Sequence, residues 1–155
     1  MERDEEYMHR IMMENKETVM PLLRYLPWLM QHAGESASSD YNGDGLAEHS
    51  ISFPVYDSTL LGFIREASQS PLMDKNYPYV YTRSHLKTHE DERRVIEMAT
   101  WKEWDILRGI LSKYVLGGRV KSVLWSEAVK ENIFYLVLKR MKEIIEFWDK
   151  PIENI

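Results

Sequence analysis

Cysteine is absent from the 155 residues of this chain. Its absence excludes disulfide bonds, thiol catalysis and cysteine-ligated metal centres together, and it fits a reducing cytoplasm. Long apolar runs are missing as well, since no stretch approaches the roughly 20 residues that a membrane-spanning helix requires. The first ten residues, MERDEEYMHR, are acidic and carry no apolar secretory core. We therefore expect no membrane span, no export and a cytoplasmic location.

Concentrated positive charge is scarce. The formal net charge is -5, and acidic residues outnumber basic ones by more than two to one over residues 1–50. The slight basic excess over residues 101–155 is interleaved with acids. Non-specific binding to nucleic acid depends on clustered cations, so this pattern argues against nucleic acid as a partner.

Signatures of catalysis are also missing. No serine lies in a Gly-x-Ser-x-Gly elbow, and no glycine-rich phosphate loop follows a predicted strand. We assign no catalytic residue and no cofactor. The sequence favours a non-enzymatic protein and leaves an enzyme open, because it does not show which of its many carboxylates converge in space.

The chain is rich in helical periodicity, above all over residues 100–149. Four of the five tryptophans lie there, and apolar residues recur at three- and four-residue spacing. Thr88 and Thr100, each followed three residues later by an acid, are typical of capping boxes. Gly117-Gly118 and Asn132 are typical helix ends. We predict a mainly α, compact single domain over residues 1–155 with about six helices.

The first half of the chain is less regular. Residues 1–16 carry a thin apolar stripe and are expected to form a peripheral segment that either frays or docks on the body or on a second copy. A second helix is expected to begin near Thr18. Pro27 should then divide it at Leu26. Residues 33–50 are predicted to be a flexible loop because they are rich in Gly, Ser, Asp and Asn.

A small two-stranded ribbon is predicted from residues 51–56 and 76–82. The second of these segments alternates Tyr77, Tyr79 and Tyr81 with other residues, so the three rings would share one face of a strand. We interpret that face as packed on the helical core, with a protein interface as the alternative.

The run LRGILSKYVLGGRVKSVLWSEAVKENIFYLVLKRMKEI (107–144), preceded by FPVYDSTLLGFI (53–64), resembles an uncharacterised bacterial family, the domain of unknown function 6508. The pattern departs from that family at Ser122 and Asn132, where glycines are expected. The resemblance implies a small, mainly helical bacterial protein and carries over no activity.

Two polar patterns raise the question of metal binding. Asp40, Asn42 and Asp44 match the first half of a calcium loop, but the position that needs a bidentate glutamate is Ile51. Asx turns explain the same residues. His85 and His89 are four residues apart and could hold zinc on one helix face, although the predicted helix begins after Thr88 and no third ligand follows.

Residues 101–130 also fit a helix-turn-helix arrangement. Its second helix, predicted over residues 120–130, would present Arg119, Lys121 and Ser122 to a major groove. Glycine-joined helix pairs are common in any bundle, and Glu127 and Glu131 make this helix acidic further on. The leading hypothesis is therefore a cytoplasmic bacterial interaction or regulatory protein, plausible as a homodimer through its N-terminal segment. A DNA-binding protein and a metal-dependent enzyme are the alternatives.

Overall fold

The computed structural model describes residues 2–32, 38–41, 53–121 and 123–149. This part of the chain is mainly α, as predicted, with eight α-helices, one 3₁₀ turn and one two-stranded ribbon. The helices are α1 (Glu2–Leu23), α2 (Leu26–Gln31), α3 (Ser58–Gln69), α4 (Tyr77–Arg83), α5 (His89–Met98), α6 (Trp104–Gly117), α7 (Val123–Lys130) and α8 (Ile133–Asp149). The 3₁₀ turn η1 spans Trp101–Glu103, and the strands are β1 (Ser38–Tyr41) and β2 (Phe53–Tyr56).

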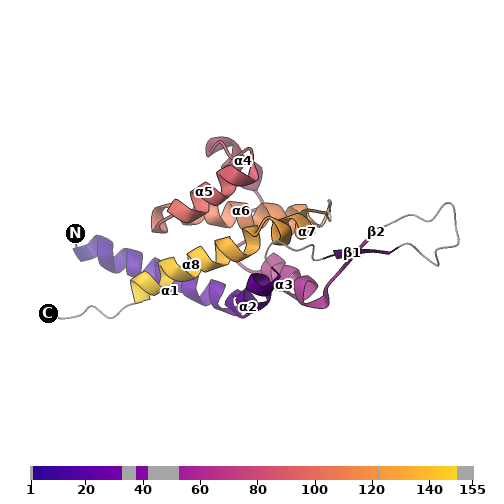
Figure 1. The fold of residues 1–155 in the computed structure, drawn as a ribbon. Helices are drawn as coiled ribbons and strands as arrows, with labels where there is room; N and C mark the ends of the chain where they lie inside the picture. The colour runs from indigo at the N-terminus through magenta and orange to yellow at the C-terminus, as the bar shows by residue number, and fades with distance from the viewer. Residues whose placement is uncertain (1, 33–37, 42–52, 122, 150–155) are drawn as a thin grey trace, which may run out of the picture.

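Helix α8 is the centre of the fold. It packs against α1, α2, α5, α6 and α7, and Figure 1 shows α1 running beside it in the opposite direction. Its inward face follows the predicted period: Ile133, Val137 and Met141 are fully buried. Side chains from α1 through α8 join one hydrophobic cluster, so α8 gathers the chain around a common core.

The N-terminal region is one continuous helix rather than a short segment followed by a second helix near Thr18. Helix α1 runs through that position to Leu23 and carries Pro21 in its last turn. Met12 is only 2% exposed and belongs to the core, so this part of the stripe docks on the body of the same chain, whereas Tyr7 stays 57% exposed. The break before Pro27 was predicted correctly, since α2 begins at Leu26 and holds this proline in its first turn.

The predicted ribbon exists with a different partner. Strand β2 pairs in antiparallel register with β1, so that Ser38 lies opposite Tyr56 and Tyr41 lies opposite Phe53. The first of these strands falls inside the segment 33–50 that was predicted to be a flexible loop, and the rest of that segment lies outside the described residues.

Residues 77–83 form helix α4, so the strand predicted over residues 76–82 is wrong. Pro78 occupies the first turn of a helix, where its missing N–H costs nothing. Packing then fixes the helix, because the buried Val80 meets α6 at Gly109. A Cβ at this glycine would lie 2.7 Å from Val80 Cγ1, so α4 and α6 cross closely at this point.

Other local signals are confirmed. Thr88 and Thr100 each form a capping box. Asn132 adopts the left-handed conformation with φ 66° that a helix end favours. Helix α6 ends at Gly117, but Gly118 has φ -66°, so a left-handed backbone does not explain this glycine. A Cβ there would lie 2.1 Å from Trp125 Nε1, so contact with the indole requires it.

Candidate functional site

The first turn of α5 is fixed by its cap. The Thr88 hydroxyl accepts a hydrogen bond from the Asp91 N–H at 3.1 Å, and the Asp91 carboxylate accepts from the N–H groups of Lys87 and Thr88 at 3.0 and 3.2 Å. These backbone donors, Lys87 first, lower the pKa of Asp91. The cap sets the rotation of α5, so the next residue, Glu92, points inward.

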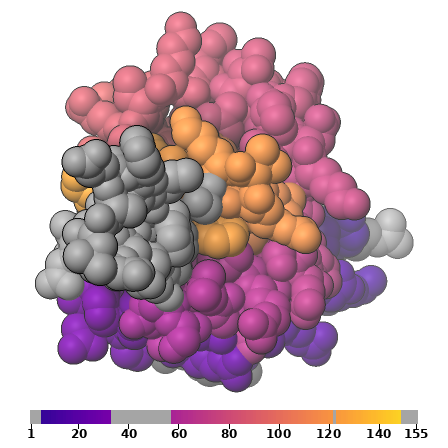
Figure 2. All heavy atoms as spheres, turned by 90° about the vertical axis from the view of Figure 1, so that its right-hand side faces the viewer, coloured from indigo at the N-terminus to yellow at the C-terminus, as the bar shows by residue number. Residues whose placement is uncertain are grey.

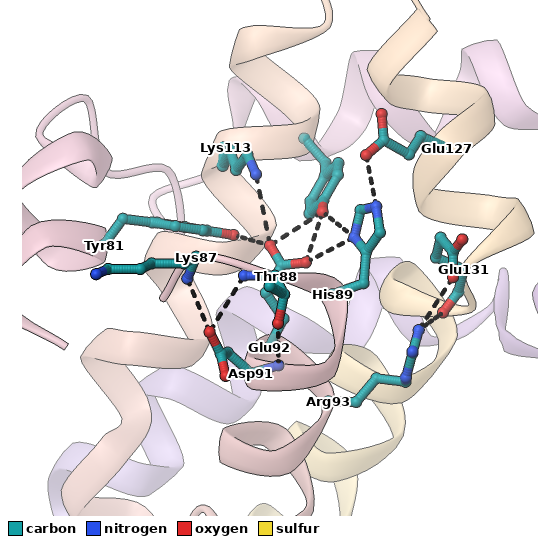
Figure 3. Close-up of polar contacts among 11 residues, drawn as sticks. Tyr81, Lys87, Thr88, His89, Asp91, Glu92, Arg93, Lys113, Glu127 and Glu131 are labelled. Carbon is teal, nitrogen blue, oxygen red and sulfur yellow. Dashed lines mark hydrogen bonds and ion pairs between the residues drawn. The ribbon is translucent and has the colours of Figure 1, made fainter. Parts of the chain in front are cut away.

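Glu92 is the hub of a polar cluster between α4, α5, α6 and α7, shown in Figure 3. It is only 1% exposed. Tyr81 donates a hydrogen bond to Glu92 Oε2, and the Tyr114 hydroxyl lies 2.7 Å from Oε1 and 2.9 Å from Oε2. Lys113 Nζ lies 3.6 Å from Oε2. A buried carboxylate is tolerated only when charge and hydrogen-bond donors surround it, and this one has both.

His89 extends the cluster to α7. Its Nδ1 lies 3.0 Å from Glu92 Oε1, and its Nε2 lies 2.7 Å from Glu127 Oε1. Each ring nitrogen faces a carboxylate and can donate a hydrogen bond to it when it carries a proton. The Tyr114 hydroxyl is also within 3.1 Å of Nδ1. Beside this contact, Arg93 Nη1 lies 3.1 Å from Glu131 Oε2, so two polar contacts join α5 to α7 and to the residue that follows it.

The tyrosines of the cluster are held in their neutral form. Burial raises the pKa of Tyr81 far above its ordinary value, and the negative charge of Glu92 raises it further. The same two causes, in the same order, raise the pKa of Tyr114. Ionising either hydroxyl would remove a donor from Glu92 and place two negative charges side by side.

This arrangement is chemically suited to joining helices. It also contains groups that could transfer protons. Three cavities lined by described residues lie elsewhere, and none of the three includes a side chain of the cluster. Because the hydrogen bonds and ion pairs of Glu92 and His89 join side chains from α4, α5, α6 and α7, we call this cluster the polar clamp.

Sequence analysis missed the clamp, although a signal was present. Glu92 lies four residues before Ile96 and seven before Ala99, and both of these are 1% exposed. A carboxylate on the apolar face of a helix is a reason to look for buried partners. Those partners, Tyr81 and Tyr114, come from other helices, and local spacing does not reveal them.

A second feature is an aromatic groove, which we define by the residues that line it. It has a volume of about 520 Å³ and is lined by Ala99, Thr100, Trp101, Lys102, Arg140, Glu143, Ile144, Phe147 and Trp148. The rings of Trp101 and Trp148 meet edge to face at 6.3 Å. Arg140 Nε donates to the Ala99 carbonyl at 2.9 Å, which ties the end of α5 to α8. Phe147 remains 67% exposed.

His85 and His89 do not form a metal site with other described side chains. His85 is exposed and adopts φ 55° in the turn after α4, outside the helix as expected. His89 is the first residue of α5, and both of its ring nitrogens face carboxylates. Within the described ranges, no three His, Cys, Asp or Glu side chains are arranged to hold a metal ion.

Of the three residues in the calcium-like pattern, the structure describes only Asp40. Asn42 and Asp44 lie outside the described residues. Asp40 belongs to β1, where its backbone pairs opposite Pro54.

Arg119 and Lys121 are exposed, but they precede helix α7 and do not occupy its first turn. The helix predicted from Val120 starts at Val123, and Ser122 lies outside the described residues. Val120, between these two cations, is 94% exposed. Figure 2 looks at the molecule from the right-hand side of Figure 1. It shows the orange surface around α7 between the pink surface above and the magenta surface of α3 below.

The three tyrosines predicted to share a strand face are spread around helix α4. Successive positions of a helix turn by about 100°, so residues two apart point to different sides. Tyr79 is 56% exposed, whereas Tyr81 points to Glu92 and Tyr77 is half-buried. The shared strand face is therefore wrong, and an interface at these tyrosines stays a prediction.

Comparison with known proteins gives no family. No family model, curated protein or solved structure matches the chain. The resemblance to domain of unknown function 6508 stays a prediction. None of the described helices has both the length and the hydropathy of a membrane-spanning segment.

Proposed function

We propose that this protein is an interaction module that associates with a second copy of itself through the aromatic groove. The exposure of Phe147 carries the proposal. This side chain is 67% exposed on the groove, and Met98, directly before Ala99, is 71% exposed. An exposed aromatic side chain that lines a groove together with other rings is typical of protein contacts, while single exposed apolar residues are ordinary.

The composition of the groove fits the same role. Tryptophan, phenylalanine and arginine are enriched where proteins meet, and Trp101, Trp148, Phe147 and Arg140 all line this surface. The rings give contact area at little entropic cost, since each has only two side-chain torsions. The polar clamp lies away from the groove and offers no such surface.

The setting we propose is the bacterial cytoplasm. The absence of cysteine supports a reducing compartment. The resemblance to the bacterial family gains one supporting detail: Asn132, where that pattern has glycine, adopts φ 66°, a conformation that glycine and asparagine accept most readily.

The test is the molar mass of the full chain as a function of concentration, measured by light scattering after gel filtration. Wild-type protein should show a concentration-dependent rise toward twice the monomer mass, and Phe147→Ser should shift that rise to higher concentration. Val120→Ser is the matched control, because Val120 is 94% exposed in the turn between α6 and α7, and Figure 1 shows α7 at the opposite end of α8 from the groove. Wild-type protein that stays monomeric throughout would refute the proposal.

A further inference from the structure

We propose that the groove of one copy receives the acidic start of α1 from the other copy, with Tyr7 seated against its rings. This inference rests on the proposed self-association and names the surface that fills the groove. Three observations carry it: the charge of the groove, the chemistry of the segment, and the place of both at one end of the molecule.

The groove carries available positive charge. Lys102 Nζ lies 5.8 Å from the centre of the Trp101 ring, and within the described residues no carboxylate lies at ion-pair distance from it. Arg140 is partly compensated, since its Nη1 lies 3.8 Å from Glu143. The groove therefore combines aromatic walls with a cation at its rim, and it fits a partner that is aromatic and acidic.

The start of α1 has this chemistry. Residues 2–6 are ERDEE, with four acids and one arginine, and Tyr7 follows. Glu5 and Glu6 are exposed, and Tyr7 is 57% exposed. Its ring is apolar and its hydroxyl can stay hydrated, which suits a contact that forms and dissociates in water.

The two surfaces lie at the same end of the molecule. Helices α1 and α8 contact each other and run in opposite directions, so the first turns of α1 and the last turns of α8 lie at the same end of the molecule in Figure 1. Met12 anchors α1 in its own core and holds Tyr7 at the surface. A two-fold axis at this end would place each copy's acidic segment over the other copy's groove.

A two-fold dimer of this kind contains two identical contacts, each between the groove of one copy and the acidic segment of the other. In an isologous dimer both grooves and both acidic segments are buried, which doubles the area contributed by one groove. This matters because a stable interface buries about 800 Å² on each partner, more than a single side chain in a groove supplies. The opposite charges should also speed association at low salt.

Two complementary variants test the inference. The segment variant carries Glu5→Lys, Glu6→Lys and Tyr7→Ser, and the groove variant carries Lys102→Glu and Phe147→Ser. The glutamates, Tyr7, Lys102 and Phe147 are all exposed, so both variants should keep the helical circular dichroism of the wild type. Each alone should dimerise at least about tenfold more weakly than wild type.

An equal mixture of the two variants is the decisive sample. The segment variant keeps an intact groove and the groove variant keeps an intact segment, so the mixture restores one of the two contacts. It should form a heterodimer that neither variant forms with itself, detected by light scattering and by pull-down with one tagged partner. Combining Glu5→Lys and Glu6→Lys with Lys102→Glu in one chain should also recover part of the association.

The possible failures are distinct. If the segment variant dimerises as well as wild type while Phe147→Ser does not, this inference is overturned and the groove remains a self-association surface. If the mixture of variants is no tighter than either alone, the pairing of segment with groove is wrong. If the wild type never dimerises, both the inference and the proposed function fail.

Discussion

Alkaline pH should destabilise this protein through Tyr81 and Tyr114. Burial and the charge of Glu92 raise the pKa of both hydroxyls in the folded state. In the unfolded chain each would titrate near the ordinary value of about 10. A group whose pKa is raised by folding contributes stability that is fully present below the unfolded pKa and is lost as the pH rises above it.

The size of the effect follows from proton linkage. Above about pH 10, the folded state keeps one proton on each of these tyrosines that the unfolded state releases. Each retained proton lowers the free energy of unfolding by about 1.4 kcal/mol per pH unit, so two give about 2.7. Across two pH units the loss is about 5 kcal/mol, comparable to the whole stability of many small domains.

The assay is urea unfolding at a series of pH values from neutral to alkaline, followed by circular dichroism. Tyr114→Phe removes one of the two linked protons, so its free energy of unfolding should fall less steeply by about 1.4 kcal/mol per pH unit. Tyr79→Phe removes an exposed tyrosine outside the clamp and controls for the loss of one phenol. The reasoning is refuted if Tyr114→Phe and Tyr79→Phe have the same slope above about pH 10.

Three further substitutions test the packing. Gly109→Ala places a Cβ 2.7 Å from Val80 Cγ1, so it should cost roughly 1–3 kcal/mol in urea unfolding despite the better helix propensity of alanine, and Val80→Ala in the same chain should restore part of it. Gly118→Ala places a Cβ 2.1 Å from Trp125 Nε1 and should change tryptophan fluorescence; an unchanged spectrum would contradict the contact. Glu92→Ala removes the acceptor of two buried hydroxyls and should cost about 3 kcal/mol or more in thermal unfolding, whereas wild-type stability would show that the clamp contributes little.

The elements that sequence analysis predicted correctly have local causes. The cap at Thr88 involves atoms within four residues of one another, and the end of the helix before Asn132 depends on a single backbone torsion. The final helix, α8, repeats its apolar residues over more than four turns, so its existence and its buried face follow from spacing alone. Signals that depend only on residues close together in the chain can be recognised in the sequence without knowledge of the tertiary contacts.

Helix α4 shows where such signals fail. Residues 77–82 alternate in a way that is typical of a strand, and aromatic residues have high strand propensity. The decisive contact is Val80 on Gly109, a residue in another helix. Strand propensity is weak and depends on context, so a buried crossing with α6 overrides it.

His89 shows the same limit for the candidate site. Sequence analysis singled it out for its distance from His85, but its partners in the fold are Glu92 and Glu127. The first lies one turn away on the same helix, and the second lies on α7. The spacing of two histidines indicated a metal site, whereas the fold places carboxylates on both sides of one imidazole.

Helix α5 connects the clamp to the groove. Its first residue, His89, belongs to the clamp, and Ala99, directly after its last residue, lines the groove. Ten residues of helix span about 15 Å, so a small rotation at one end is carried to the other as a rigid body. The Arg140 bond to the Ala99 carbonyl fixes only the far end. By fixing the direction of α5, the clamp helps to hold Ala99 and the groove wall behind it in place, which is the position that the proposed self-association requires.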